Sequence, residues 1–316
     1  MSVGAVILAY QRREMLREVL ERLADLPLAE VLVADNGSDG TAEMVRGWGG
    51  NVRLVHEGEN LGAAARNVAA EAATSDLLVM LDDDSWPLPG AIEELTALFE
   101  RRPDLGVAGG YVIDVGDAGE QLRAEEVGTF DWFLRAGRHG DPPDGLEAFF
   151  FPEGACMVRR SAWLAVGGCF APYFLTLTEL DLATRMLAAG WDVRYAPRAR
   201  FAHAKAEGGR PPAGRILHLR VRNQLWYFWL RFGALRAARR IPAYLLFDLV
   251  ECGYRGATAE WRRAVVAAWR GRAELREHRA PVSRAVARRA ELTRGRLHLR
   301  LLAAMLRRRL AGRAGT

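Results

Sequence analysis

The first third of the chain alternates between short apolar runs and amphipathic segments. Val3 to Ala9 and Glu30 to Asp35 are apolar runs of strand length. The segment between them spaces its apolar side chains i, i+3, i+4, i+7, as an amphipathic helix does, at Leu16, Val19, Leu20 and Leu23. The order predicts a strand, a helix and a second strand.

The same alternation continues as far as residue 81. A helix is expected near Thr41, a strand over Val52 to His56, a helix rich in small residues within "GAAARNVAAEAA", and a strand over Asp76 to Leu81. Strands that alternate with helices predict an α/β fold, with a parallel sheet covered by helices. Ligands of such sheets bind beyond the carboxyl ends of the strands.

Length and composition set the scale of the molecule. A chain of 316 residues that is 50% hydrophobic can bury a full core, as one large domain with an appendage or as two domains. The apolar opening "VGAVILAY" has no basic residue before it, so we expect a first strand and no signal peptide. No segment approaches the roughly 18 uninterrupted apolar residues of a membrane span. The three cysteines lack the close spacing of a zinc or thiol redox motif, which favours a reducing cytoplasm.

The net charge of +5 conceals two oppositely charged regions. Residues 1–205 carry 32 acidic and 19 basic side chains, whereas residues 206–316 carry 7 and 25. We therefore expect the chemistry in a domain over 1–205, and a basic, mainly helical region over 206–316 that faces an anionic partner. Lys205 is the only lysine, so the arginine excess reflects a bias of the whole composition.

Two of the expected strands end in acidic residues. Asp35 is followed by "NGSDGT", a turn that exposes backbone N–H groups and that could contact a ligand or simply connect a strand to a helix. Asp82, Asp83 and Asp84 follow the other strand, and three adjacent carboxylates repel one another unless a cation or a set of hydrogen-bond donors is present. Mg²⁺ and Mn²⁺ commonly combine one or two carboxylates with substrate phosphates. A metal and diphosphate site is favoured over an exposed turn.

A series of motifs resembles the family 2 glycosyltransferases of the GT-A fold. They are "VILAYQRREMLREVLERL", "EVLVADNGSDGT", "NLGAAARNVAAEAATSDLLVMLDDDSWP", "FPEGACMVRRSAWLAVGG" and "ELDLATRMLAAGWDVRYAPRARFAH". The resemblance covers about residues 3 to 205 in the family's motif order. It implies a GT-A catalytic domain with a Rossmann-like, mostly parallel sheet, which uses a nucleotide-sugar donor.

The resemblance also implies a donor site and a metal site. Asp35 matches the residue that contacts the nucleotide base, Arg66 and Asn67 match a pair on the nucleotide side, and the three aspartates match the DXD region that holds the ribose and the metal. The expected donor-binding residues are Ala9, Tyr10, Asp35, Asn36, Arg66, Asn67, Asp82 and Asp83. The expected ligands of Mn²⁺ or Mg²⁺ are Asp84 first, then Asp82 and His203. Taken alone, a histidine such as His203 is more often a surface or core residue.

Catalysis is the next implication. Glu179 inherits the role of the base, with Asp181 beside it, although both could simply occupy the acidic first turn of a helix capped by Thr178. Glu153, Gly154 and Ala155, in "FPEGA", fall where relatives shape the sugar and acceptor pocket. The expected reaction is an inverting single displacement, in which an acceptor hydroxyl of a glycan, a lipid-linked or a small molecule attacks the anomeric carbon.

The sequence departs from the family's pattern at three places. Thr178 stands where Glu is usual, "CFAP" replaces Phe-Asp-Glu after Gly168, and Gln11 stands where Asn is frequent. These changes bear on the acceptor and the sugar more than on the reaction. A nucleotidyltransferase, whose Gly-rich loop is missing from "AYQRRE", and a non-catalytic nucleotide-sugar-binding module are the alternatives.

The basic region interleaves arginines with aromatic and aliphatic residues between positions 215 and 250. This pattern suits helices that lie at an anionic membrane surface, and packing onto the catalytic domain is the alternative. Nucleic acid is a less favoured partner, because no nucleic-acid motif accompanies the charge. The expected location is the cytoplasm, with peripheral association at the inner face of the membrane.

Overall fold

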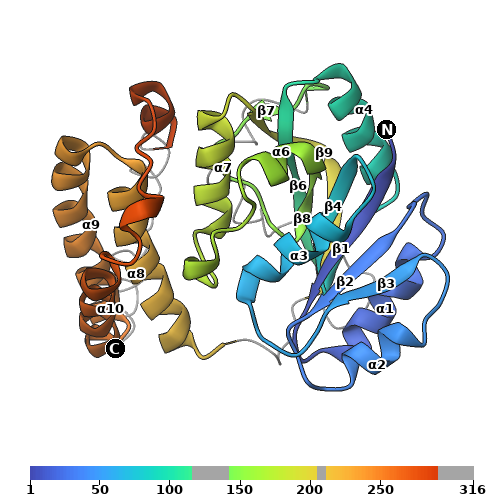
Figure 1. The fold of residues 1–316 in the computed structure, drawn as a ribbon, viewed down its shortest axis with the longest axis horizontal. Helices are drawn as coiled ribbons and strands as arrows, with labels where there is room; N and C mark the ends of the chain where they lie inside the picture. The colour runs from blue at the N-terminus through green and yellow to red at the C-terminus, as the bar shows by residue number, and fades with distance from the viewer. Residues whose placement is uncertain (116–141, 205–210, 291–316) are drawn as a thin grey trace, which may run out of the picture. The chain divides into compact units, whose positions relative to one another are not determined.

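The computed structural model describes residues 1–115, 142–204 and 211–290. The chain forms two compact units, Met1–Pro211 and Pro212–Thr316. The first contains a sheet flanked by helices, and the second is helical in its described part (Figure 1).

The first unit contains one nine-stranded mixed sheet. Its strands are β1 (Val3–Ala9), β2 (Val31–Asp35), β3 (Val52–His56), β4 (Leu77–Asp82), β5 (Ser85–Pro87), β6 (Leu105–Val115), β7 (Leu146–Glu147), β8 (Ala155–Arg159) and β9 (Asp192–Ala204). They are ordered β3-β2-β1-β4-β8-β6-β9-β5, with β7 paired to β9. The strands β3, β2, β1 and β4 are parallel, as expected from the sequence, whereas β8 runs antiparallel to both β4 and β6.

The register brings three strand ends to one edge of this sheet. Ala9 of β1 lies opposite Asp35 of β2, and Leu8 lies opposite Asp82 of β4. Because parallel strands share a carboxyl edge, the acidic residues that follow β2 and β4 lie on either side of β1.

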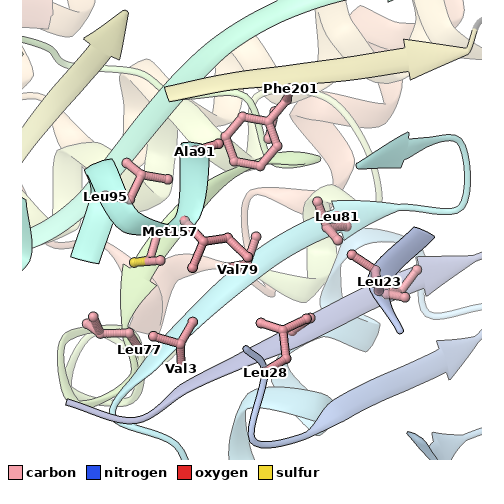
Figure 2. Packing of buried hydrophobic residues seen from close by; sticks show 14 of the residues in the cluster. Val3, Leu23, Leu28, Leu77, Val79, Leu81, Ala91, Leu95, Met157 and Phe201 are labelled. Carbon is pink, nitrogen blue, oxygen red and sulfur yellow. The ribbon is translucent and has the colours of Figure 1, made fainter. Parts of the chain in front are cut away.

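Helices cover both faces of the sheet. They are α1 (Arg13–Leu23), α2 (Thr41–Arg46), α3 (Ala65–Ala72), α4 (Ala91–Arg101), α6 (Arg160–Ala165) and α7 (Thr178–Ala188), with 3-10 turns at η1 (Gly62–Ala64) and η3 (Ala171–Tyr173). One core contains α1, α2 and α4, and the other contains α3, α6 and α7. The alternation along β4 explains the two cores, because Leu77, Val79 and Leu81 face α1 and α4 (Figure 2) while Leu78 and Met80 face the other side.

A buried carboxylate ties β2 to the loop before β4. Glu30 is 6% exposed, and its Oε1 accepts hydrogen bonds of 2.7–3.0 Å from the N–H and hydroxyl groups of Thr74 and Ser75. Arg53 pairs with the other oxygen at 3.1 Å. Burial alone raises the pKa of Glu30, but these hydrogen bonds outweigh it and lower the pKa to about 2.

The second unit packs three helices against one another, namely α8 (Ala213–Arg231), α9 (Ala234–Tyr254) and α10 (Thr258–Gly271), followed by a 3-10 turn η4 (Arg276–His278). The aromatic rings of α8 are largely internal: Phe228 contacts Phe232, and it contacts Tyr244 of α9 with centroids 4.5 Å apart. Across the described ranges, no helix combines the length and the apolar character that crossing a bilayer needs. The three cysteines are free and buried.

Candidate active site

The end of β2 forms the first part of the site. Asp35 is 1% exposed and accepts a hydrogen bond of 2.7 Å from the Gly37 N–H, and burial raises the pKa of its carboxyl. The amide of Asn36 donates to the Gly62 carbonyl at 2.9 Å and accepts from the Leu61 N–H at 3.1 Å, which joins this turn to η1. Ala9 is buried at the end of β1, and Tyr10 beside it is exposed.

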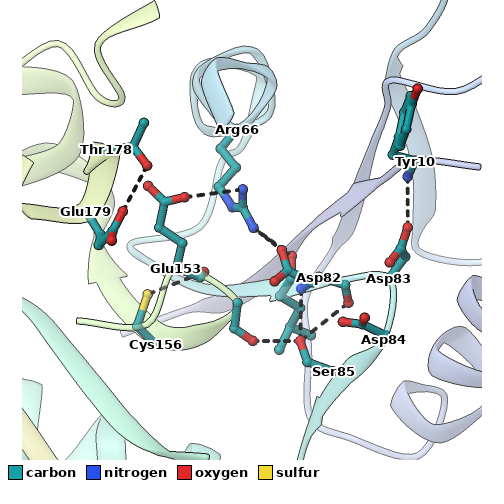
Figure 3. Close-up of polar contacts among 12 residues, drawn as sticks. Tyr10, Arg66, Asp82, Asp83, Asp84, Ser85, Glu153, Cys156, Thr178 and Glu179 are labelled. Carbon is teal, nitrogen blue, oxygen red and sulfur yellow. Dashed lines mark hydrogen bonds and ion pairs between the residues drawn. The ribbon is translucent and has the colours of Figure 1, made fainter. Parts of the chain in front are cut away.

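The three aspartates after β4 have different surroundings (Figure 3). Asp82 has a side chain that is 41% exposed, and it forms an ion pair with the buried guanidinium of Arg66. Asp83 points into the fold and accepts a hydrogen bond of 2.8 Å from the Tyr10 N–H. Burial raises the pKa of Asp83 to about 7, against the opposing effects of Arg12 and that N–H. Asp84 is also buried.

Arg12 is a functional candidate that the sequence reasoning missed. Its Nη1 lies 2.8 Å from Asp83 Oδ1 and 2.7 Å from Asp84 Oδ2, so one guanidinium neutralises two of the three carboxylates. The sequence carries a usable signal, because Arg12 follows β1 by three residues and β1 lies next to β4. The sequence position of Arg12 indicates a contact with the aspartates only once β1 and β4 are known to be neighbours.

His203 reaches the aspartates through the pairing of β9. It lies opposite Ser85 of β5 and Asp114 of β6 in the sheet. Its Nδ1 is 3.0 Å from Asp114 Oδ1, and its Nε2 is 3.5 Å from Asp84 Oδ1. The carboxylate of Asp84 raises the pKa of His203 to about 9, with Asp114 acting in the same direction and burial opposing both. Asp114 was not among the expected site residues.

The metal expectation can be tested on these side chains. In the part of the chain that the structure describes, no group of three or more His, Cys, Asp and Glu is arranged to hold a metal ion. Asp84 Oδ1 is nevertheless a buried carboxylate oxygen without a hydrogen-bond partner among the described residues, and it faces an imidazole nitrogen. A carboxylate and an imidazole that has lost its proton fit a site for Mn²⁺ or Mg²⁺.

The residues expected to act on the acceptor lie at the start of α7. Thr178 is the first helical residue, and its hydroxyl donates to Glu179 Oε2 at 3.0 Å. No side chain caps this helix, so the interpretation of Thr178 as a cap is wrong. Glu179 and Asp181 do lie in the acidic first turn.

A chain of polar contacts joins the two sides of the site. Arg66, which pairs with Asp82, also lies 3.8 Å from Glu153, and the carboxylate of Glu153 lies beside Thr178, whose hydroxyl donates to Glu179 (Figure 3). Burial raises the pKa of Glu153, which Arg66 opposes. The chain therefore connects the residue expected at the donor to the residue expected to act as base.

Close packing against Asp82 explains the glycine of the "FPEGA" segment, Gly154. A Cβ added to Gly154 would lie 2.2 Å from Asp82 Oδ2, so only glycine lets the segment approach the aspartates this closely. Ala155, the first residue of β8, is buried. The three expected pocket residues thus lie directly beside the end of β4.

The side chains of Asp181 and Asn67 make contacts that stabilise the loop around Gly168. Asp181 is fully buried and pairs at 2.7 Å with Arg185, which donates to the Gly168 carbonyl at 2.6 Å. Asn67 exchanges two hydrogen bonds of 2.8 Å with the backbone of Cys169. Both residues fix the loop around Gly168, and their expected contacts with donor or acceptor stay predictions.

Comparisons with known proteins agree with this architecture. The family model described as glycosyl transferase family 2 matches residues 5–166. N-acetylglucosaminyl-diphospho-decaprenol L-rhamnosyltransferase of Mycobacterium tuberculosis is 33% identical over 250 residues, which cover 67% of this chain and 79% of that protein.

Solved structures show the same fold at low identity. TarS 1-349 of S. aureus in complex with UDP-GlcNAc has a TM-score of 0.61 at 13% identity, covering 94% of this chain and 88% of that one. Mannosyltransferase PcManGT from Pyrobaculum calidifontis in complex with GDP-Man and Mn²⁺ has a TM-score of 0.57 at 19% identity, covering 96% and 86%. The expected GT-A fold with a helical C-terminal region is confirmed.

Proposed function

The chain belongs to glycosyltransferase family 2 and is therefore a glycosyltransferase rather than a nucleotidyltransferase. We propose that it transfers a sugar from a nucleoside diphosphate sugar to an acceptor hydroxyl, with inversion of configuration. The polar chain from Asp82 through Arg66 and Glu153 to Glu179 is the observation that carries this proposal. It links a group suited to the donor with a group suited to accept a proton.

The donor lies along the carboxyl edge of β1, β2 and β4. Asp35 receives the nucleotide base, and the partly exposed Asp82, oriented by Arg66, receives the ribose. Asp84 and His203 hold Mn²⁺ or Mg²⁺, which neutralises charge on the diphosphate when it is bound. Arg12 pairs with Asp83 and Asp84 and holds the two carboxylates in place.

Glu179 is the base in this proposal. Its carboxylate takes the proton of the acceptor hydroxyl, the hydroxyl oxygen bonds to the anomeric carbon, and the bond to the diphosphate breaks on the opposite face. Thr178 orients the carboxylate through its hydrogen bond of 3.0 Å. Asp181 acts through Arg185 on the loop beside the base and is a positioning residue.

The substrates are proposed by analogy with the rhamnosyltransferase of Mycobacterium tuberculosis. We propose that the sugar is L-rhamnose or a similar deoxyhexose, and that the acceptor is a lipid-linked diphosphate glycan of the cell envelope. Such an acceptor lies in a membrane, so the enzyme works as a peripheral protein at the inner membrane surface. The free hydroxyl of the acceptor sugar is the group that reaches Glu179.

A donor screen by thermal stabilisation tests this proposal. A nucleoside diphosphate L-rhamnose with Mn²⁺ should raise Tm, because a ligand at 100 times its Kd stabilises the folded state by about 2.7 kcal/mol. The same sugar as a free monosaccharide is the control. Absence of stabilisation by every nucleoside diphosphate sugar, with and without Mn²⁺, contradicts the proposed donor site.

A further inference from the structure

The second unit contains a cavity of about 740 Å³ that none of the catalytic residues line. It lies between the first turns of α9 and the segment that begins at Val282. Five arginines contribute to its lining, and no acidic side chain does so among the described residues: Arg236, Arg239, Arg240, Arg284 and Arg288.

The five arginines gather positive charge around this cavity. Arg236 lies in the first turn of α9, which has no acidic residue there. Arg284 begins a second helical segment, in which the Ala287 N–H bonds to the Ser283 carbonyl at 3.0 Å. Five guanidinium groups around one cavity are suited to bind the oxygens of a phosphate group.

The same helix also exposes apolar side chains. Leu246 is 64% exposed and Val250 is 47% exposed, on α9. Their spacing from Arg239, at i+7 and i+11, places this arginine on the same face of the helix. A phosphate site beside exposed aliphatic side chains matches the headgroup and the acyl boundary of a lipid surface.

We propose that the cavity binds the phosphate groups of anionic phospholipids and thereby docks the second unit on a membrane surface. Charge complementarity selects the anionic lipid, because each basic residue near such a surface adds to the attraction. This cavity is then the place where the enzyme contacts the membrane, and the proposal rests on the peripheral location in the proposed function. Its test needs neither donor nor acceptor, so it can fail while the transfer reaction stands.

Vesicle sedimentation of the full chain tests this site. Vesicles of phosphatidylcholine and phosphatidylglycerol in equal amounts should bind the protein, and vesicles of phosphatidylcholine alone should bind it far less. The double substitution Arg239→Gln with Arg288→Gln should weaken binding about tenfold or more. Arg262→Gln with Arg270→Gln, two exposed arginines of α10, removes the same charge outside the cavity and should weaken it less than about threefold.

The two double variants separate the outcomes. Unchanged Tm and unchanged donor-induced stabilisation exclude misfolding as the cause of lost binding. An equal loss in both variants, or no loss in either, overturns the proposal in favour of diffuse attraction. Binding of inorganic pyrophosphate without vesicle binding overturns the lipid source, and a cavity-dependent preference for duplex DNA over vesicles overturns the choice of partner.

Discussion

At the scale of single residues, Asp84 has two oxygens in different surroundings. Its Oδ2 lies 2.7 Å from Arg12, whereas its buried Oδ1 faces His203 and has no hydrogen-bond partner among the described residues. Because this oxygen lies 3.5 Å from Nε2 of His203 and Asp84 raises the pKa of that histidine, a divalent cation that binds here would take the place of the imidazole proton. Oδ1 of Asp84 is therefore the atom expected to bind the metal.

Substitution of Asp84 should separate metal binding from folding. Asp84→Ala is expected to abolish Mn²⁺-dependent donor binding while the protein stays folded, because it also removes one charge from a repelling cluster. Calorimetric titration of the donor with and without Mn²⁺ measures this. Asp25→Ala, at an exposed position, is the control. Undiminished Mn²⁺-dependent affinity in Asp84→Ala rejects the assignment.

Arg12 makes a second residue-scale prediction. Its side chain is 13% exposed and its two carboxylate partners are 4% exposed, so Arg12→Gln removes the guanidinium that both buried carboxylates contact. We expect a loss of about 3 kcal/mol in the free energy of unfolding, and a larger gain in Tm from Mn²⁺ than the wild type shows. Urea denaturation and thermal melting measure both. An equal Mn²⁺ effect in the two proteins means that Arg12 is independent of the metal site.

Glu179 and Asp181 should respond differently to neutralisation. Glu179→Gln keeps the size of the side chain, so donor affinity should persist while single-turnover transfer falls by about 10² to 10⁴. Asp181→Asn breaks the ion pair between this fully buried carboxylate and Arg185, and should lower stability together with activity. Near wild-type transfer in Glu179→Gln, with Asp181→Asn inactive but folded and donor-competent, moves the base to Asp181.

At the scale of elements, Glu30 anchors β2 to the loop before β4. It thereby helps to align the ends of the two strands, where Asp35 and Asp82 lie. Its pKa is about 2, below the ordinary value of 4.5. A carboxylate whose pKa is depressed on folding contributes stability above its unfolded pKa, and this contribution is lost as the pH falls toward the folded pKa. The stabilisation should therefore decline between about pH 4.5 and pH 2.

Glu30→Gln should destabilise the protein at pH 7 by about 1–3 kcal/mol, because the charged acceptor of several hydrogen bonds is lost. The difference from wild type should shrink at pH 3.5. Urea denaturation at both pH values measures it, with Glu21→Gln on the exposed side of α1 as the control. A difference that stays constant with pH contradicts the role given to the charge.

Local pattern was enough to predict the elements up to β4. The expected strand over Val52 to His56 agrees with the structure, and the helix expected near Thr41 starts at that residue. The strand β5 was missed, because three residues carry no periodicity and their partner β9 lies more than 100 residues away. The helices expected between positions 215 and 250 are α8 and α9, and the aromatic rings of α8 pack internally.

At the scale of the whole molecule, the family motifs placed the candidate residues around the carboxyl edge, but the local pattern could not give their partners. Arg12 meets Asp83 and Asp84 from the neighbouring strand, and His203 reaches Asp84 through β9. The side-chain amide of Asn67 hydrogen-bonds the backbone of Cys169, which is 102 residues away. Each of these contacts depends on strand order and loop placement, which no short sequence pattern encodes.

The anomeric configuration of the product tests the central claim most directly. The full chain is incubated with Mn²⁺, a nucleoside diphosphate L-rhamnose and a polyprenyl diphosphate N-acetylglucosamine acceptor, and the product linkage is read by proton NMR. A single displacement with Glu179 as base predicts a new glycosidic bond whose configuration is opposite to that of the donor. Retention of the donor configuration, or no transfer from a donor that stabilises the protein, contradicts the account.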